Sequence, residues 1–217
     1  MKVLELFSGT RSIGRAFEKR GHDVFSVDYD ERFVANVHED IEYLTPEMVL
    51  EMFGHPDVIW ASPDCTTFSI AGISHHRTKN QNTGQLDAKS EYALKCDRVD
   101  LQTVRLIRDL RPTYWFIENP RGGLRKMDWM QWAPRYTVTY CQYGDTRMKP
   151  TDIFTNHPHP MFKAPCKNGD PCHEAAPRGA KTGTQGLATI DRSRIPEELC
   201  EHIVELCEQA LNEPTII

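Results

Sequence analysis

The stretch VLELFSGTRSIGRAFEKRG, residues 3–21, decides the fold class. Its first five residues form the short apolar run that is typical of a buried strand. Residues 11–21 follow with a helical pattern that Gly21 closes. A strand, a glycine-containing turn and a helix in this order form the first half of a βαβ unit.

Short apolar runs and helical patterns alternate along the rest of the chain. We predict strands at 23–28, 57–62, 113–120, 135–144 and 151–156, and helices at 31–40, 46–54, 99–112 and 195–211. Strands separated by helices favour parallel pairing, because each crossover helix packs back onto the sheet. The sequence therefore predicts an α/β fold with a doubly wound, mostly parallel sheet and helices on both faces.

Composition narrows the class of protein. The chain has 217 residues, of which 39% are hydrophobic and 26% charged, enough for one good-sized core. No apolar run approaches the roughly 20 residues that span a bilayer, so no membrane association is expected. The seven cysteines are an odd number in a chain too large to need disulfide staples, which favours a reducing, cytoplasmic setting.

The formal net charge of −5 argues against a generally basic nucleic-acid-binding protein. Two local stretches are basic, HHRTK (75–79) and RGGLRK (121–126). Either could hold phosphates, and either could equally be solvated loop charge.

Two segments interrupt the alternation. Residues 70–90 are polar without an apolar period and indicate a long mobile loop, a kind of segment that is usually functional or disordered. Residues 157–189 are rich in Pro, Gly and polar residues and predict an irregular insertion without a core of its own.

Cysteine and histidine residues gather in this insertion: Cys166, Cys172 and His173, preceded by His157 and His159. A CysCysHisHis zinc site would staple a loop that has no core. The Cys-x5-Cys-His spacing is irregular, however, and adjacent ligands are hard to place on one tetrahedral ion. Zinc binding and a plain or substrate-facing loop both stay open, and no metal ligand is assigned.

A cofactor pocket is expected at the carboxyl ends of the first strands, where doubly wound sheets bind ligands. Gly9 follows the first strand and lets the backbone approach a ligand closely. Asp28 ends the second strand, where a carboxylate can accept hydrogen bonds from ribose hydroxyls. Asp40 and Ile41 could hold an adenine amine and its ring face. The loop lacks the full GxGxxG pattern, which favours an adenosine cofactor without a pyrophosphate.

The chemically reactive candidates follow the next strands. Cys65 comes just after the strand at 57–62, in WASPDCTTFS (60–69), and Glu118 and Asn119 end the strand at 113–120. A thiol is a useful nucleophile only as a thiolate, which needs partial exposure and a favourable electrostatic setting. Burial of Glu118 would raise its pKa towards a value useful for donating a proton. The alternative is a buried, inert cysteine.

Together these segments resemble the DNA cytosine-5 methyltransferase family over residues 1–156. ELFSGTRSIGRAF resembles its Asp-Leu-Phe-Ala-Gly start, and SVDYDE and EDI resemble its ribose and adenine segments. PDCTTFS resembles its Pro-Cys-Gln-x-Phe-Ser nucleophile loop, FIENPRGG its Glu-Asn-Val strand, and YGDTRMKPTDIF its Tyr-Gly-x-x-Gln-x-Arg-x-Arg strand. Each motif is modest alone, and their common order makes the combination specific.

The resemblance implies a Rossmann-like methyltransferase sheet, S-adenosylmethionine as cofactor and cytosine in DNA as substrate. It implies catalytic roles for Cys65, Glu118, Asn119 and Lys149. The residues that it places at the cofactor are Phe7, Ser8, Gly9, Asp28, Tyr29, Asp40, Ile41 and Pro63. It divides the chain into a catalytic core at 1–156, the insertion at 157–189 in place of a target-recognition domain, and a C-terminal helix at 190–217 that packs back on the core.

Several departures from the family pattern leave alternatives open. Asp64 replaces the proline before the nucleophile, and its carboxylate should raise the pKa of Cys65. Arg147, Lys149 and Thr151 replace Gln, Arg and Arg, so the second arginine is missing unless Arg147 substitutes for it. The short insertion cannot build a second core, so sequence specificity would be relaxed or supplied by a protein partner. The same chemistry on a free pyrimidine nucleotide, and a degenerate DNA- or cofactor-binding module, are the alternatives.

Overall fold

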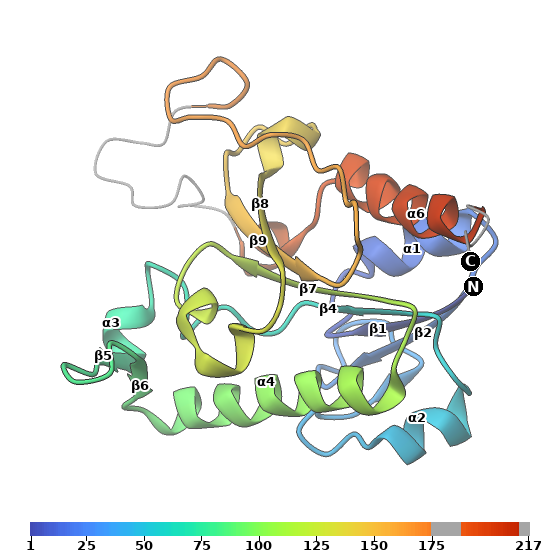
Figure 1. Cartoon of the computed structure of the whole chain (residues 1–217), viewed down its shortest axis with the longest axis horizontal. Helices are drawn as coiled ribbons and strands as arrows, with labels where there is room; N and C mark the ends of the chain where they lie inside the picture. Colours follow the sequence, from blue (N-terminus) through green and yellow to red (C-terminus); the bar gives the residue numbers. More distant parts are fainter. Residues whose placement is uncertain (175–187, 213–217) are drawn as a thin grey trace.

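The fold is a seven-stranded sheet between two layers of helices (Figure 1), within residues 1–174 and 188–212, the part of the chain that this computed structural model describes. The strand order is β3-β2-β1-β4-β7-β9-β8. The first five strands in this order are parallel to one another. Strand β9 runs antiparallel to β7, and β8 runs antiparallel to β9. Their bounds are β1 Lys2–Leu6, β2 Asp23–Asp28, β3 Val37–His38, β4 Val58–Ala61, β7 Tyr114–Pro120, β8 Arg135–Thr139 and β9 Pro150–Thr155. The predicted fold class is confirmed.

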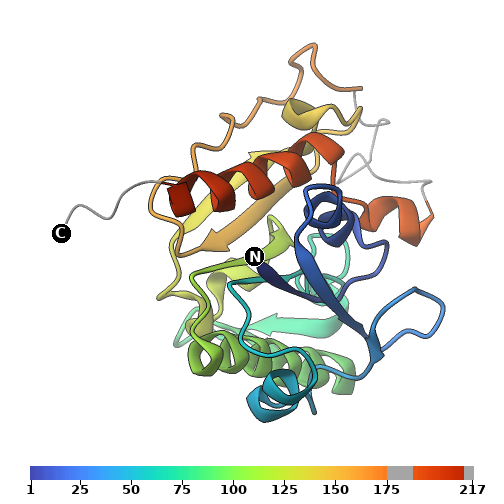
Figure 2. The same ribbon diagram turned by 90° about the vertical axis from the view of Figure 1, so that its right-hand side faces the viewer.

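Alternating side chains of the central strands enter two separate cores. Val3, Val58 and Trp60 pack with α1 (Ser12–Lys19) and α6 (Glu197–Asn212). Leu4, Ile59 and Ala61 pack on the opposite face with α2 (Pro46–Met52) and α4 (Glu91–Leu110). Figure 2 shows the strands between α6 and α1 on one side and α4 and α2 on the other. Burial on both faces explains why the strands read as continuous apolar runs.

Residues 31–40 differ from the prediction, and the expected helix there is wrong. The chain instead turns and adds the short strand β3 beside β2. The Asn36 side chain accepts hydrogen bonds from the Ser26 amide and hydroxyl at 2.8 and 2.9 Å. These contacts to a neighbouring strand outweigh the local helical pattern.

Residues 70–90 also contain more regular structure than expected. Helix α3 (Ile73–His76) precedes an antiparallel hairpin of β5 (Arg77–Lys79) and β6 (Leu86–Ala88). Leu86 and Arg77 are buried, so the hairpin is anchored to the core at both strands. Helix α4 begins at Glu91, earlier than predicted, because the Ser90 hydroxyl caps it by accepting from the Ala93 amide at 3.1 Å.

The predicted strand at 135–144 is shorter in the structure. It ends at Thr139 and continues as the 3-10 helix η3 (Tyr140–Tyr143). The remaining short helices are η1 (Leu124–Lys126), η2 (Asp128–Met130) and α5 (Thr189–Ser193).

The predicted insertion at 157–189 is described except for residues 175–187, and residues 213–217 of the predicted C-terminal segment also lie outside the described residues. Residues 157–174 contain no helix or strand. The Lys163 amide donates to the Tyr143 hydroxyl at 2.9 Å, and the Cys166 amide donates to Thr139 Oγ1 at 3.0 Å. Helix α6 lies along α1 (Figure 1), and Lys19 reaches Glu201 at 2.9 Å. The division into three segments stays a prediction.

Helices in the described part of the chain all fall short of the length and apolar character that crossing a bilayer requires.

Candidate active site

The loop that carries Cys65 follows β4 as a tight turn. The amides of Phe68 and Ser69 both donate to the Cys65 carbonyl, at 3.0 and 2.7 Å. Cys65 is a free thiol and partly exposed, while Pro63 beside it is buried. Cys65 as a residue is therefore neither fully buried nor freely exposed.

Two glycines after β7 hold this loop against the neighbouring strand. The Gly123 amide donates to the Phe68 carbonyl at 2.7 Å. A Cβ atom on Gly122 would lie 2.3 Å from the same carbonyl oxygen, so only glycine permits this approach. The contact fixes the Cys65 loop next to the end of the strand that carries Glu118.

Arg77 supports the loop from the other side, a role that the sequence did not indicate. Its Nε donates to the Thr67 carbonyl at 3.1 Å, its Nη2 donates to Asp97 at 2.7 Å, and its guanidinium lies 3.9 Å from the centre of the Phe68 ring. Its side chain is fully buried. Arg77 is therefore an internal support of the nucleophile loop and cannot contact phosphate.

Arg125, from the second basic stretch, is partly buried and is also engaged within the protein. It forms an ion pair with the buried carboxylate of Asp152 and donates to Thr137 Oγ1 at 3.1 Å. The basic side chains that are exposed to solvent are Arg121 and Lys126 in this stretch and Lys79 in the hairpin. The expected phosphate-binding faces are thus smaller than the sequence indicated.

Glu118 lies in β7 with only 7% of its surface exposed. Burial raises the pKa of its carboxyl, while Lys149 and a hydrogen bond from Tyr140 oppose this rise. The Tyr140 hydroxyl donates to Glu118 Oε1 at 3.0 Å, a partner that the sequence did not indicate. A raised pKa is the property expected of a carboxyl that donates a proton.

Asn119 joins the two strand ends. Its Nδ2 donates to the Pro63 carbonyl at 3.0 Å, so the residue after the acid is tied to the loop before the thiol. Its Oδ1 is buried without a hydrogen-bond partner among the described residues.

The pKa of the Cys65 thiol is raised to about 11. Burial is the largest cause, followed by the negative charges of Glu118 and Asp64, and Lys149 acts in the opposite direction. The structure thus brings Cys65, Glu118 and Lys149 close enough for their charges to interact. Asp64 raises the pKa of Cys65 as the sequence predicts. The sequence did not indicate the larger effect of the Glu118 charge.

Asp64 is engaged by the hydroxyl of Tyr92, which donates to Oδ2, and by the Thr66 amide, which donates to Oδ1 at 2.6 Å. These two hydrogen bonds stabilise the carboxylate of Asp64. Tyr92 lies at the start of α4, so this helix contacts the nucleophile loop directly.

Lys149 has a left-handed backbone with φ 27° and lies over the Tyr140 ring, with Nζ 4.4 Å from its centre. Its ammonium group donates to the Arg192 carbonyl at 2.8 Å. Arg147 pairs with Asp145 and donates to the Asp191 carbonyl at 3.0 Å, so it is already engaged away from Glu118. Thr151 is buried. Arg147 and Lys149 both precede β9. Lys149 is therefore the one whose charge acts on Glu118 and Cys65.

The glycine loop after β1 lies where the sequence predicts the cofactor pocket. Phe7 and Gly9 have left-handed backbones, with φ 58° and 45°. The Gly9 amide donates to Asp28 Oδ2 at 2.7 Å. Ser8 Oγ is buried without a hydrogen-bond partner among the described residues. An unpaired hydroxyl beside a glycine turn and a carboxylate fits a polar ligand such as a nucleoside.

The adenine segment is only partly placed as expected. Ile41 is 2% exposed and belongs to the core that packs against α4. Asp40 Oδ2 lies 2.7 Å from Lys95 Nζ, a cation that the sequence did not indicate. Tyr29 is 66% exposed as a residue. Partial desolvation of its hydroxyl, followed by the charge of Asp64, raises its pKa. Tyr29 and the Cys65 loop are thus close enough for the charge of Asp64 to act on the tyrosine hydroxyl.

Comparison with known proteins gives the family. A family model described as C-5 cytosine-specific DNA methylase matches residues 1–129. The chain belongs to this family. A probable DNA (cytosine-5)-methyltransferase of Frog virus 3 (isolate Goorha) is 27% identical over 95% of this chain and 100% of its own length. The predicted family and enzyme class of this cytosine methylase are confirmed.

One solved structure shares the fold of the cytosine methylase at low identity. The structure of a putative DNA modification methyltransferase encoded in an E. coli prophage has a TM-score of 0.51 and 16% identity, covering 71% of this chain and 46% of that one. The S. pombe Dnmt2 methyltransferase has a TM-score of 0.49 and 15% identity, covering 71% of this chain and 49% of that one. The chain thus spans the full length of its viral relative and about half the length of these solved structures.

Proposed function

We propose that this cytosine methylase transfers a methyl group from S-adenosylmethionine to C5 of cytosine in DNA through a covalent bond between Cys65 and C6. The family supports methyl transfer to DNA cytosine. The observation that carries the proposal is the pairing of β4 with β7, where Ala61 is the partner of Ile117. This register brings Cys65 and Glu118 to the carboxyl ends of adjacent parallel strands, where such sheets bind their ligands.

The cofactor residues would be those of the glycine loop and its neighbours: Phe7, Ser8, Gly9, Asp28, Tyr29, Asp40, Ile41 and Pro63. Ser8 Oγ has an unused hydrogen-bonding capacity, and Asp28 can accept further hydrogen bonds beside those from Gly9 and Asp30. S-adenosylmethionine, when bound, supplies a methyl group on a sulfonium that a carbon nucleophile can take.

Catalysis by the protein would overcome the low nucleophilicity of cytosine C5. The Cys65 thiolate forms a bond to C6, while Glu118 gives its proton to N3, and C5 gains enamine character. After C5 has been methylated, it gives its proton to a water molecule, the bond between C6 and Cys65 breaks, and Glu118 recovers the proton from N3. Asn119 orients Glu118 relative to the nucleophile loop through its bond to Pro63.

Protonation of Glu118 and ionisation of Cys65 would favour each other. The negative charge of Glu118 raises the pKa of Cys65, so a neutral Glu118 removes part of the obstacle to forming the thiolate. The neutral carboxylic acid is also the form that can protonate N3. Lys149 lowers the pKa of both groups and would stabilise the thiolate.

The substrate is proposed as a flipped cytosine in DNA, since a base inside a duplex is out of reach of the Cys65 loop. Residues 157–174 contain no helix or strand, so we expect relaxed sequence specificity or specificity supplied by a protein partner. The same shortness leaves a free pyrimidine nucleotide as the second candidate. The seven free cysteines fit a reducing, cytoplasmic setting.

The test uses labelled S-adenosylmethionine with duplex DNA, single-stranded DNA and dCMP in parallel, and a Cys65→Ala variant as control. We expect label in C5 of cytosine in DNA and none with the variant. Label in dCMP alone would favour the nucleotide reaction. Cofactor binding without transfer to any of the three would leave a binding module.

A further inference from the structure

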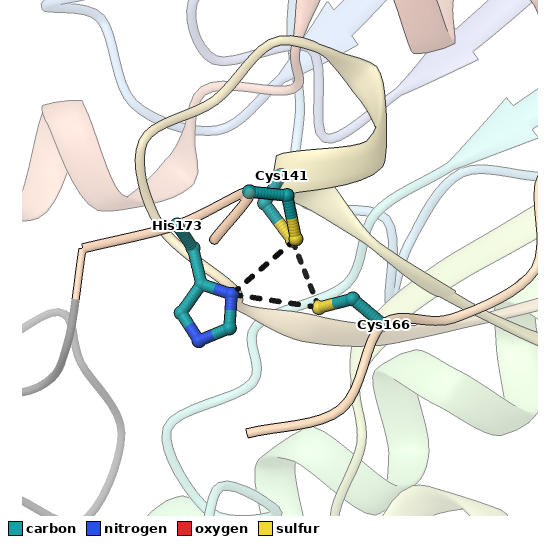
Figure 3. Close-up of side chains that lie close together, drawn as sticks. Cys141, Cys166 and His173 are labelled. Carbon is teal, nitrogen blue, oxygen red and sulfur yellow. Dashed lines mark hydrogen bonds between the residues drawn. The ribbon is translucent and has the colours of Figure 1, made fainter. Parts of the chain in front are cut away.

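A second cluster of reactive side chains lies outside the active site. It consists of Cys141, Cys166, Cys172 and His173, whose sulfur and nitrogen atoms all lie within 4.8 Å of one another. Cys141 belongs to η3, and the other three residues belong to the segment after β9. Figure 3 shows Cys141, Cys166 and the imidazole of His173 directed towards a common point. Segments that are distant in sequence thus bring four soft ligands together.

The distances in the cluster are close to those of a tetrahedral metal site. Zinc bonds of about 2.3 Å to sulfur and about 2.0 Å to nitrogen imply ligand separations of about 3.8 Å between sulfurs and about 3.6 Å from sulfur to nitrogen. Sγ of Cys172 lies 3.6 Å from that of Cys141 and 3.5 Å from Nδ1 of His173. Cys166 Sγ lies 3.6 Å from the same Nδ1.

One separation is shorter than a metal site requires. The sulfurs of Cys141 and Cys166 are 3.0 Å apart, closer than two ligands of one zinc ion and farther than the roughly 2.05 Å of a disulfide. Opening this pair by less than about 1 Å would give it the separation of two sulfurs bound to one zinc ion. A disulfide between these two residues would instead leave Cys172 and His173 without a role.

We propose that Cys141, Cys166, Cys172 and His173 bind one zinc ion in a closed, structural site. Three thiolates and a neutral imidazole fill all four positions of a tetrahedral ion, which leaves none for a reacting water. Binding would release the protons of the three thiols. Gln142 Nε2 donates to Cys172 Sγ at 3.3 Å, the kind of outer hydrogen bond that supports a metal-bound thiolate.

The ligand set differs from the one considered in the sequence. His157 is buried, with Nε2 3.2 Å from the Leu206 carbonyl and its ring on Tyr114, so it lies outside the cluster. Cys141 takes part although it lies far upstream. The adjacent Cys172 and His173 can share one ion because His173 presents Nδ1, the ring nitrogen nearer its backbone.

Such a site would stabilise both the insertion and one wall of the active site. Residues 157–174 contain no helix or strand, so a metal would supply the cross-links that a core supplies elsewhere. Cys141 follows Tyr140, whose hydroxyl binds Glu118. Zinc would therefore hold η3 in the position from which Tyr140 reaches the catalytic acid.

The experiment measures metal content by mass spectrometry in full-length protein purified with a reducing agent and dialysed against zinc-free buffer. We expect one zinc per chain in the native protein and in Cys65→Ala, which removes a thiol outside the cluster. Cys172→Ser and His173→Gln should bind zinc at least tenfold more weakly. Cys172 is exposed, so its substitution by serine removes a ligand without changing the core.

Cobalt replacement gives a second readout that does not depend on any variant. Co²⁺ titrated into the metal-free native chain should give the intense visible bands of a tetrahedral thiolate site, with one equivalent at saturation, and zinc should remove them. The proposal is overturned if the reduced native chain binds neither metal, if Cys172→Ser retains one tightly bound zinc, or if peptide mapping finds a Cys141–Cys166 disulfide in the purified protein.

Discussion

The hydroxyl of Tyr140 donates a 3.0 Å hydrogen bond to Oε1 of Glu118 in the interior of the protein. Burial raises the pKa of Glu118, and this bond limits the rise by favouring the carboxylate. The two residues come from β7 and η3, so the ionisation of Glu118 depends on a second segment of the chain. This relationship leads to the first prediction.

Tyr140→Phe should move the alkaline limb of the kcat/KM profile for methyl transfer to higher pH. The hydrogen bond from Tyr140 favours the carboxylate, so losing it should raise the pKa of Glu118 further. Tyr143→Phe is the matched control, since that hydroxyl contacts His202 Nδ1 and not Glu118. A limb that stays in place or moves to lower pH in Tyr140→Phe would contradict the assignment of Glu118 as the acid.

Asp64→Asn should make Cys65 more reactive. Removing the adjacent negative charge lowers the pKa of the thiol, so alkylation of Cys65 by iodoacetamide at pH 8 should accelerate about two- to fivefold. Peptide mass spectrometry separates Cys65 from the exposed Cys172. Tyr92→Phe removes a hydrogen-bond donor from Asp64 but keeps its charge, so it should not accelerate the reaction. Equal acceleration in both variants would point to loosening of the loop and away from charge.

Glu5→Gln should stabilise the protein at alkaline pH. Burial raises the pKa of Glu5 to about 7 from 4.5. The unfolded chain therefore ionises this group more readily than the folded chain, and stability is lost as pH rises from about 4.5 to above 7. At pH 8 the lost stability is about 3 kcal/mol, and glutamine should recover a large part of it.

Urea unfolding at pH 4.5 and pH 8 measures this effect. Glu5→Gln should change the free energy of unfolding far more at pH 8 than at pH 4.5. Glu51→Gln, at an exposed acid of α2, is the control and should change the free energy of unfolding little at either pH. A gain for Glu5→Gln that is equal at both pH values would mean that its charge is not the cause.

Arg77→Met should destabilise the chain by about 2–4 kcal/mol, because it leaves Asp97 without its buried partner and removes the contact with Phe68. Arg98→Met, which breaks the exposed pair with Glu42, should cost less than about 1 kcal/mol. We also expect Arg77→Met to lower kcat for methyl transfer, since Arg77 supports the Cys65 loop. Unchanged stability and unchanged kcat would remove that role.

Much of the fold could be predicted from the sequence because the central strands are buried on both faces. Runs such as VLELF (3–7) and DVIWA (57–61) are apolar throughout, and a parallel sheet between helices is the arrangement that buries them. The predicted helix at 31–40 failed because Asn36 binds β2 through its side chain, a contact between segments that local periodicity does not report.

The ends of the parallel strands could be predicted as the site for a similar reason: Cys65, Glu118 and Asp28 each follow or end an apolar run. The residues that support these side chains could not be predicted in this way. Tyr140, Arg77 and Lys95 act through contacts with residues far away in the sequence. A basic side chain in a polar stretch indicates solvent exposure, and Arg77 is buried only because Asp97 and Phe68 lie beside it.

The central claim is that Cys65 bonds to C6 of the target cytosine. DNA containing 5-fluorocytosine tests it most directly, since a fluorine at C5 cannot leave as a proton does and the bond to C6 then persists. Incubation with S-adenosylmethionine should give a denaturation-resistant complex, and peptide mapping should find the base on Cys65. The Cys65→Ala variant should form none. Label transfer to ordinary DNA without any trapped complex, or a complex through another residue, would contradict the account.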